Sequence, residues 1–114
     1  MIITKNSPFT KEDIKKLREL FDVYIKIVID VKQKICSAGC NRHFESEKVL
    51  LNQGSKPEDL WGGGIDIQSL VIDCNSFINI RPQQNNPSNE ILDQKIRKQF
   101  EELSHFFFKE LYVK

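Results

Sequence analysis

An alternating run of residues from Tyr24 to Val31 constrains the fold of this chain more than any other feature. Apolar side chains occupy every second position, and a period of two is that of a β-strand. One face carries Ile25, Ile27, Ile29 and Val31, and the other carries Tyr24, Lys26, Val28 and Asp30. A second β-prone run, from Ile35 to Cys40, follows after three polar residues. The two runs together predict a β-hairpin.

The segment before this strand predicts an amphipathic helix of about three turns. Apolar residues recur at helical spacing at Ile14, Leu17, Leu20 and Phe21. Thr10 is placed to cap the first backbone amides, and Asp13 is placed to complete a capping box. Phe9 and Ile14 occupy the two positions of a hydrophobic staple.

Weaker patterns predict the remaining elements. We expect strands at 1–4, 65–67 and 70–80, helices at 45–53 and 90–112, a helical turn at 57–60 and a break at Gly62-Gly63-Gly64. The order β-α-β-β-α-β-β-α favours an α+β fold. It would be a single domain over residues 1–114, with helices packed on a mainly antiparallel sheet of about four to five strands.

Composition and charge argue against several kinds of partner and cellular location. The 114 residues are 39% hydrophobic and 29% charged, which is ordinary for one globular domain. Lys and Arg number 17 against 16 Asp and Glu, so the charge favours neither a nucleic acid nor an anionic membrane as partner. No apolar run is long enough to cross a bilayer, and the amino terminus has no signal-peptide pattern. Three cysteines, an odd number, suit a reducing compartment, so we expect a cytoplasmic protein.

Three cysteines and a histidine raise the question of a zinc site. They are Cys36, Cys40, His43 and Cys74. On one strand, Cys36 and Cys40 would lie about 13 Å apart, which is too far for two ligands of one tetrahedral zinc unless the chain bends sharply at Ala38-Gly39. We therefore expect buried, unreactive thiols, with no metal and no cofactor.

Polar and aromatic residues at three places are candidates for a binding or catalytic site. His43 stands at the expected start of a helix, where an imidazole suits acid–base chemistry. Asp59 and Trp61 adjoin the three glycines, as in ligand-contacting loops, but without the sequence of a phosphate loop. Asn79 and Arg81 share one face of an expected strand, where amide and guanidinium groups suit a carboxylate or phosphate.

Each candidate also has a structural interpretation. A histidine at a helix start is more often solvated or bonded to the backbone. Trp61 would fill the core while the glycines let the chain turn. Arg81 would form an ion pair with Asp59 or Glu58.

Phe106-Phe107-Phe108 spread over about 200° of a helix surface. One groove within the chain rarely covers so wide an arc. We therefore expect a homodimer in which Phe106 or Phe108 is buried between two chains. The alternative is a helix almost surrounded by its own sheet.

Several short blocks occur in an order that resembles an uncharacterised family of short bacterial and archaeal proteins, a domain of unknown function. The blocks are Val28-Ile29-Asp30-Val31, Ala38-Gly39 with His43 nearby, Gly54-Ser55, Asp59-Leu60-Trp61-Gly62 and Ile78-Asn79-Ile80-Arg81-Pro82. The Asp-Leu-Trp-Gly and Ile-Asn-Ile-Arg-Pro blocks are the most specific. The resemblance implies no activity, cofactor or substrate.

Three hypotheses for function remain open. The leading one is a small intracellular binding or interaction domain that self-associates, with a ligand site drawn from His43, Asp59, Trp61, Asn79 and Arg81. The second is an enzyme acting on a small anionic substrate, with His43 as acid or base and Arg81 holding the anion. The third is a purely structural role for these residues. Convergence of His43 and Arg81 on one open pocket would favour the first two.

Overall fold

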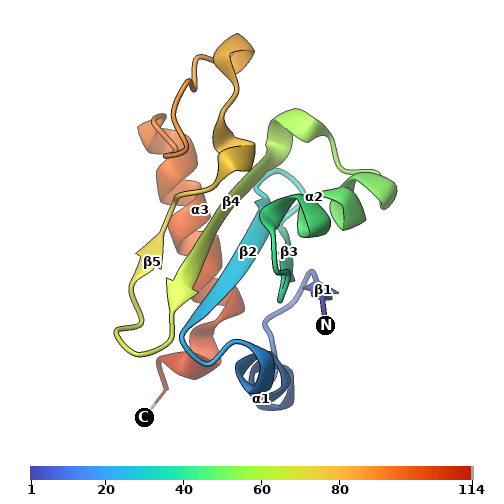
Figure 1. Cartoon of the computed structure of the whole chain (residues 1–114), viewed down its shortest axis with the longest axis vertical. Helices are drawn as coiled ribbons and strands as arrows, with labels where there is room; N and C mark the ends of the chain where they lie inside the picture. Colours follow the sequence, from blue (N-terminus) through green and yellow to red (C-terminus); the bar gives the residue numbers. More distant parts are fainter. Residues whose placement is uncertain (114) are drawn as a thin grey trace.

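Five antiparallel strands form one sheet in the computed structural model, which describes residues 1–113. They are β1 (Ile3–Lys5), β2 (Tyr24–Asp30), β3 (Ile35–Ala38), β4 (Leu60–Asp66) and β5 (Ile72–Asp73), and their order across the sheet is β1-β3-β2-β4-β5. The α-helices are α1 (Lys11–Leu20), α2 (His43–Asn52) and α3 (Gln94–Phe107). The predicted α+β class and the mainly antiparallel sheet are confirmed (Figure 1).

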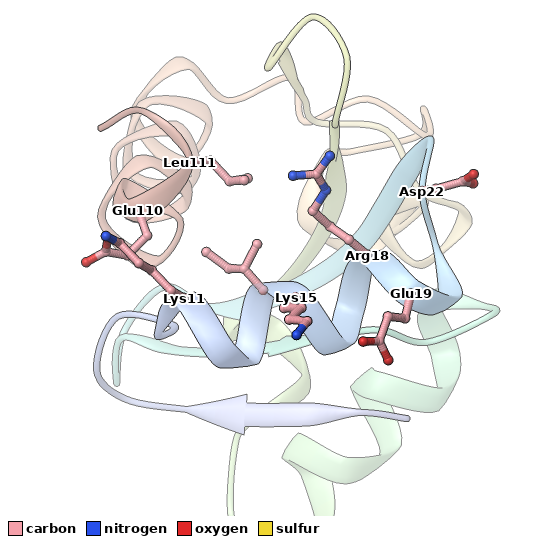
Figure 2. A pocket seen from close by; sticks show the side chains of 8 residues that line it. Lys11, Lys15, Arg18, Glu19, Asp22, Glu110 and Leu111 are labelled. Atoms are coloured by element: carbon pink, nitrogen blue, oxygen red, sulfur yellow. The ribbon is translucent and has the colours of Figure 1, made fainter. Parts of the chain in front are cut away.

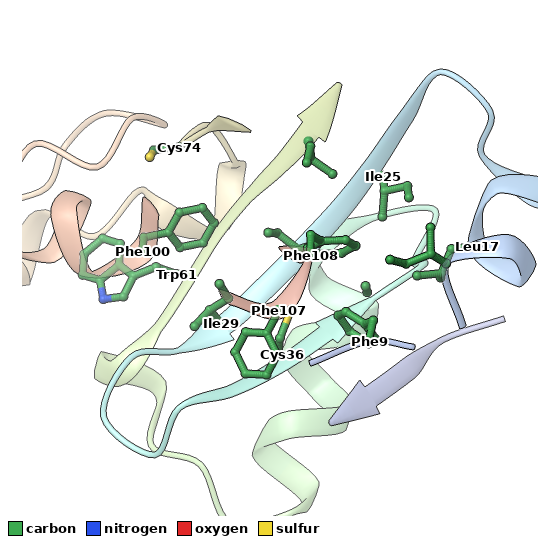
Figure 3. Packing of buried hydrophobic residues seen from close by; sticks show 14 of the residues in the cluster. Phe9, Leu17, Ile25, Ile29, Cys36, Trp61, Cys74, Phe100, Phe107 and Phe108 are labelled. Carbon is green, nitrogen blue, oxygen red and sulfur yellow. The ribbon is translucent and has the colours of Figure 1, made fainter. Parts of the chain in front are cut away.

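β2 is the central strand of the sheet, and its side chains pack into a different hydrophobic cluster on each face. Its three isoleucines are fully buried in the cluster that includes residues of α1 and α3 (Figure 3). Val28 faces the other layer, where it packs with Leu50 of α2 and Leu60 of β4. The predicted alternation of β2 is therefore confirmed, and α2 lies on the opposite face of the sheet from α3.

α1 begins as its sequence predicts. The hydroxyl of Thr10 accepts a hydrogen bond from the Asp13 amide at 3.0 Å, and the Asp13 carboxylate accepts from the Thr10 amide at 2.9 Å. Phe9 and Ile14 are both buried in the core. The capping box and the staple thus direct the apolar face of α1 toward the sheet.

The three glycines at 62–64 form the middle of β4, so the prediction of a break there was wrong. Gly62 is paired with Val28 and Gly63 with Ile27 of β2. A Cβ on Gly63 would collide with the ring of Phe100 from α3. Glycine serves here to let neighbouring side chains approach the strand closely, and not to free the backbone.

The expected strand from Leu70 to Ile80 is mostly absent. β5 has two residues, and a 3-10 turn, Phe77–Asn79, follows it. The hydroxyl of Ser76 accepts from the Ile78 amide and so starts this turn. Asn79 and Arg81 therefore do not share a strand face, and the prediction that they do was wrong.

The last helix is shorter than expected. α3 starts after Asp93, whose carboxylate accepts from the amides of Lys95 and Ile96, and it ends at Phe107. The chain then turns inward, so that the Phe108 ring is fully buried with its centroid 4.9 Å from that of Phe9. Phe108 is thus a core residue and is not available to a second chain, which corrects that part of the expected dimer contact. None of the described helices combines the length and apolar composition of a bilayer-spanning segment.

Candidate functional site

A groove opens on the α2 face of the sheet, between the first turn of α2 and the 3-10 turn Phe77–Asn79. Its volume is about 420 Å³, and it is lined by Lys26 of β2, by residues 41–44 and by residues 76–78. A smaller hollow of about 260 Å³ shares Lys26 and His43 and extends to Tyr24. We call the two together the α2-face groove.

Glycines of β4 make room for the residues that line this groove. A Cβ on Gly62 would collide with Ser76 and crowd the ring of His43. A Cβ on Gly64 would collide with the ring of Tyr24. His43 and Ser76 therefore meet over Gly62, although they are far apart in the sequence.

His43 is the first residue of α2, and its ring reaches down to the sheet. Its Nε2 lies 2.7 Å from the carbonyl oxygen of Gly63. A carbonyl only accepts, so Nε2 carries the hydrogen and Nδ1 is the bare acceptor of the neutral ring. Burial lowers the pKa of His43, the charge of Lys26 lowers it further, and the bond to Gly63 opposes both. His43 is therefore neutral at neutral pH, and its Nδ1 has no hydrogen-bond partner within residues 1–113.

The groove is electropositive. Lys26 and Arg42 line it, no lining residue is acidic, and neither cation forms an ion pair within the described chain. Two carboxylates lie close by, but both are already bonded. Glu45 accepts from the backbone amides of Asn41 and Arg42, each at 2.9 Å, and Asp73 accepts from the Tyr24 hydroxyl at 2.7 Å.

Arg81 is buried outside this groove, and the fold uses its guanidinium. It donates from Nε to the carbonyl of Ile78 at 3.0 Å, from Nη1 to that of Pro57 at 2.9 Å and from Nη2 to that of Leu60. Its Cζ lies 4.4 Å from the centre of the Trp61 ring. No carboxylate lies within ion-pair distance in the described residues. Arg81 therefore binds backbone carbonyls where an ion pair was expected.

Asn79 is fully buried and joins the loop after β5 to β4. Its Oδ1 accepts from the Gly62 amide at 2.8 Å, and its Nδ2 donates to the Gly62 carbonyl at 2.9 Å. The same Nδ2 lies 3.3 Å from the carbonyl of Cys74 and 3.0 Å from that of Asn89. The amide side chain thus pairs with Gly62 as a neighbouring strand would.

The structure separates the residues that the sequence proposed as one site. Trp61 is 2% exposed, so it lies in the core as its structural interpretation expects, and its ring packs against Arg81. Asp59 ends the 3-10 turn before β4. Asn79 belongs to the loop after β5, and its side chain is buried against Gly62. Of the five residues, His43 is therefore the one that lines the α2-face groove.

Sequence reasoning missed Lys26, Ser76 and the two phenylalanines of the groove. Lys26 stands on the polar face of β2, and that was the available signal. Phe44 and Phe77 are 53% and 84% exposed, which their sequence context does not indicate.

The cysteines are buried and unpaired, as expected. Burial raises the pKa of all three thiols, that of Cys74 to about 11. They are therefore protonated at neutral pH and poor nucleophiles. Within residues 1–113 no three His, Cys, Asp or Glu side chains are grouped as a metal ion would require.

A second hollow, of about 480 Å³, lies between α1 and the C-terminal 3-10 turn (Figure 2). Its charged lining residues are Lys11, Lys15, Arg18, Glu19, Asp22 and Glu110. Basic and acidic groups are equal in number there. This hollow therefore favours neither a cationic nor an anionic ligand.

Comparison with known proteins gives a family and no activity. Neither a curated protein nor a solved structure matches the chain. Residues 1–107 match the family described as "Protein of unknown function (DUF5674)". This match covers nearly the whole chain and confirms its resemblance to an uncharacterised family. The chain belongs to the DUF5674 family of proteins of unknown function.

Proposed function

We propose that this protein is a small intracellular binding domain and that the α2-face groove is its ligand site. The observation that carries the proposal is the pairing of unpartnered polar groups with exposed aromatic rings in one groove. Lys26 and the Nδ1 of His43 have no hydrogen-bond partner in the described chain, and Phe44 and Phe77 stand beside them. A concave site of a few hundred Å³ that combines apolar walls with a few polar groups is typical of small-molecule binding. Three unpaired thiols suit the reducing cytoplasm.

An enzyme that joins His43 to Arg81 has less support. The two side chains do not meet in one open pocket, and Arg81 already donates to three carbonyls. The bare Nδ1 of His43 is a base at neutral pH, although a weak one. No nucleophile lies within hydrogen-bond distance of it among residues 1–113. Binding therefore has more support than catalysis.

A thermal-shift screen of the full chain against metabolites tests the proposal. A ligand present at a hundred times its Kd stabilises the native state by about 2.7 kcal/mol, which raises the Tm by roughly 10 °C for a domain of this size. The stabilisation should be lost in Phe77→Ser and kept in Val71→Ser, which removes an exposed apolar side chain outside the groove. Ligands that stabilise Phe77→Ser as well as the native chain would place the site elsewhere and contradict the proposal.

We also propose that two copies of the chain associate through the face around Phe106. Phe106 is 44% exposed, and Val31 and Leu103 line the same hollow with it. Lys34 and Glu102 line that hollow too, so one patch carries both charges and can complement a second copy of itself across a two-fold axis.

Light scattering should report twice the mass of one chain at micromolar concentration, and Phe106→Ser should halve it. The exposed Phe77→Ser is the matched control and should remain dimeric. A native chain that is monomeric throughout this range would contradict self-association, and would leave the ligand site unaffected.

A further inference from the structure

We infer that the ligand of the α2-face groove is a small amphipathic anion, namely a phosphate or carboxylate attached to an aromatic or other flat apolar group. The inference rests on the proposed function and names the chemical class of its ligand. Charge, apolar surface and hydrogen-bonding groups in the groove each support one part of it.

Charge supports the anion. Lys26 and Arg42 line the groove, and no acidic side chain lines it. The carboxylates of Glu45 and Asp73 each accept two hydrogen bonds, so they do not compete for these cations through ion pairs. The groove also lies at the N-terminal end of α2, where the helix dipole adds positive potential. An unpaired cation in a concave, partly apolar site attracts an anion more strongly than one on an open surface.

Exposed aromatic surface supports the apolar part of the ligand. Phe44 lies on the α2 side of the groove and Phe77 on the loop side. Phe77 is 84% exposed and Phe44 is 53% exposed. Lone exposed apolar residues are common, but two phenylalanines with Ile78 around one cationic groove form a larger apolar surface. A flat ring carried by the ligand would cover this surface and would be held over the groove.

Two polar groups are placed to orient the anion. The hydroxyl oxygen of Ser76 accepts from the Ile78 amide, so its hydrogen remains available to the ligand. His43 is neutral with Nδ1 bare, and it becomes a donor to an anion when it takes up a proton. The charged groups that act on His43 are Lys26 of β2 and Asp73 of β5, with Arg42 beside it on the chain. An added anion would oppose the effect of Lys26 and raise the pKa of His43.

Calorimetric titration of the full chain with four probes tests the inference. Phenyl phosphate and benzoate carry both parts of the ligand, inorganic phosphate carries the anion alone, and benzyl alcohol carries the ring alone. We expect at least one of the first two probes to bind about tenfold more tightly than both of the last two. Lys26→Gln and Phe77→Ser should each weaken that probe about tenfold, while Lys15→Gln, in the hollow beside α1, should not. Which of the two anions binds better separates the phosphate and carboxylate sources.

Ring signals of the native protein give a second readout that does not depend on any variant folding. In NMR spectra the pKa of His43 should rise when the preferred probe saturates the groove. The ring signals of His105, on α3, should not respond to the probe.

Four outcomes would overturn the inference. If benzyl alcohol binds as tightly as the anionic probes and Lys26→Gln has no effect, the ligand need not be an anion, although the groove would still be a binding site. If inorganic phosphate binds as tightly as phenyl phosphate, the ligand does not need an apolar group. No binding of any probe, or loss of binding in Lys15→Gln alone, would contradict the inference, and the thermal-shift screen would then decide the proposed function separately.

Discussion

Asn79 carries the most testable structural role in this fold, because one buried amide holds three segments together. Its side chain pairs with both the amide and the carbonyl of Gly62, and its Nδ2 also faces the carbonyls of Cys74 and Asn89. We predict that Asn79→Ala strongly destabilises the chain while leaving its secondary structure largely intact. The loop after β5 would lose its main attachment to β4.

The size of the effect follows from the groups left without partners. A buried backbone group without a hydrogen bond costs about 1–3 kcal/mol. The substitution leaves the amide and the carbonyl of Gly62, a buried residue, without their hydrogen-bond partner. It also removes the Nδ2 group that faces two more carbonyls. Together these losses predict a decrease of about 3–5 kcal/mol in the free energy of unfolding, out of roughly 5–15 kcal/mol for a domain of this size. The Tm should fall by roughly 15 °C or more.

Urea unfolding followed by the fluorescence of Trp61, the one tryptophan, measures this loss. Asn75→Ala is the matched control, because Asn75 is exposed and its side chain makes no hydrogen bond within residues 1–113. The control should change stability by less than about 0.5 kcal/mol. A loss below about 1 kcal/mol for Asn79→Ala would refute the view that this amide acts as a strand neighbour of β4.

Three further predictions concern the other buried groups. The native chain should react slowly with a thiol reagent and expose three thiols on unfolding, because burial raises the pKa of each cysteine; rapid reaction of the native chain would contradict this. Stability should decrease as the pH falls below about 6.5, because the unfolded chain protonates His43 more readily than the folded one, and the decrease should level off below the folded pKa. His43→Gln should flatten that pH profile in urea unfolding, and an unchanged slope would contradict the assignment. Arg81→Lys should lower the free energy of unfolding by about 2–4 kcal/mol, because an ammonium group cannot both reach three carbonyls and stack on Trp61. Equal stability of the variant would show that the guanidinium group is not needed.

Local signals in the sequence predicted local elements well. The capping box of Thr10 and Asp13 places the start of α1, and the alternation of β2 identifies its two faces. Gly54 adopts the left-handed conformation that its position after α2 predicts, with φ of 101°. Each of these features depends on residues within one turn or one strand.

Elements that depend on distant partners were not predictable in the same way. Three consecutive glycines are equally compatible with a flexible break and with a strand under close-packed side chains. The choice is made by Phe100 on one face and Tyr24 on the other, which the sequence does not place. Likewise, nothing local indicates that Asn79 substitutes for a strand beside Gly62.

Of the five residues that the sequence suggested for a ligand site, one lies in the candidate site of the structure. His43 lines the groove, but its partners there come from β2 and from the loop after β5. Lys26 was visible on the polar face of its strand, although the loop that turns this face into a groove was itself expected to be a strand. The error in residues 70–80 therefore carried over into the site.

Chemical-shift mapping of the backbone amides tests the central claim most directly, because it reports where a ligand binds without any substitution. The full chain is titrated with phenyl phosphate, and the amide signals are followed to saturation. Binding in the α2-face groove predicts that the largest shifts fall on Lys26, His43 and residues 76–78. Saturable shifts centred on Arg81 or on the hollow beside α1, with those residues unchanged, would contradict it.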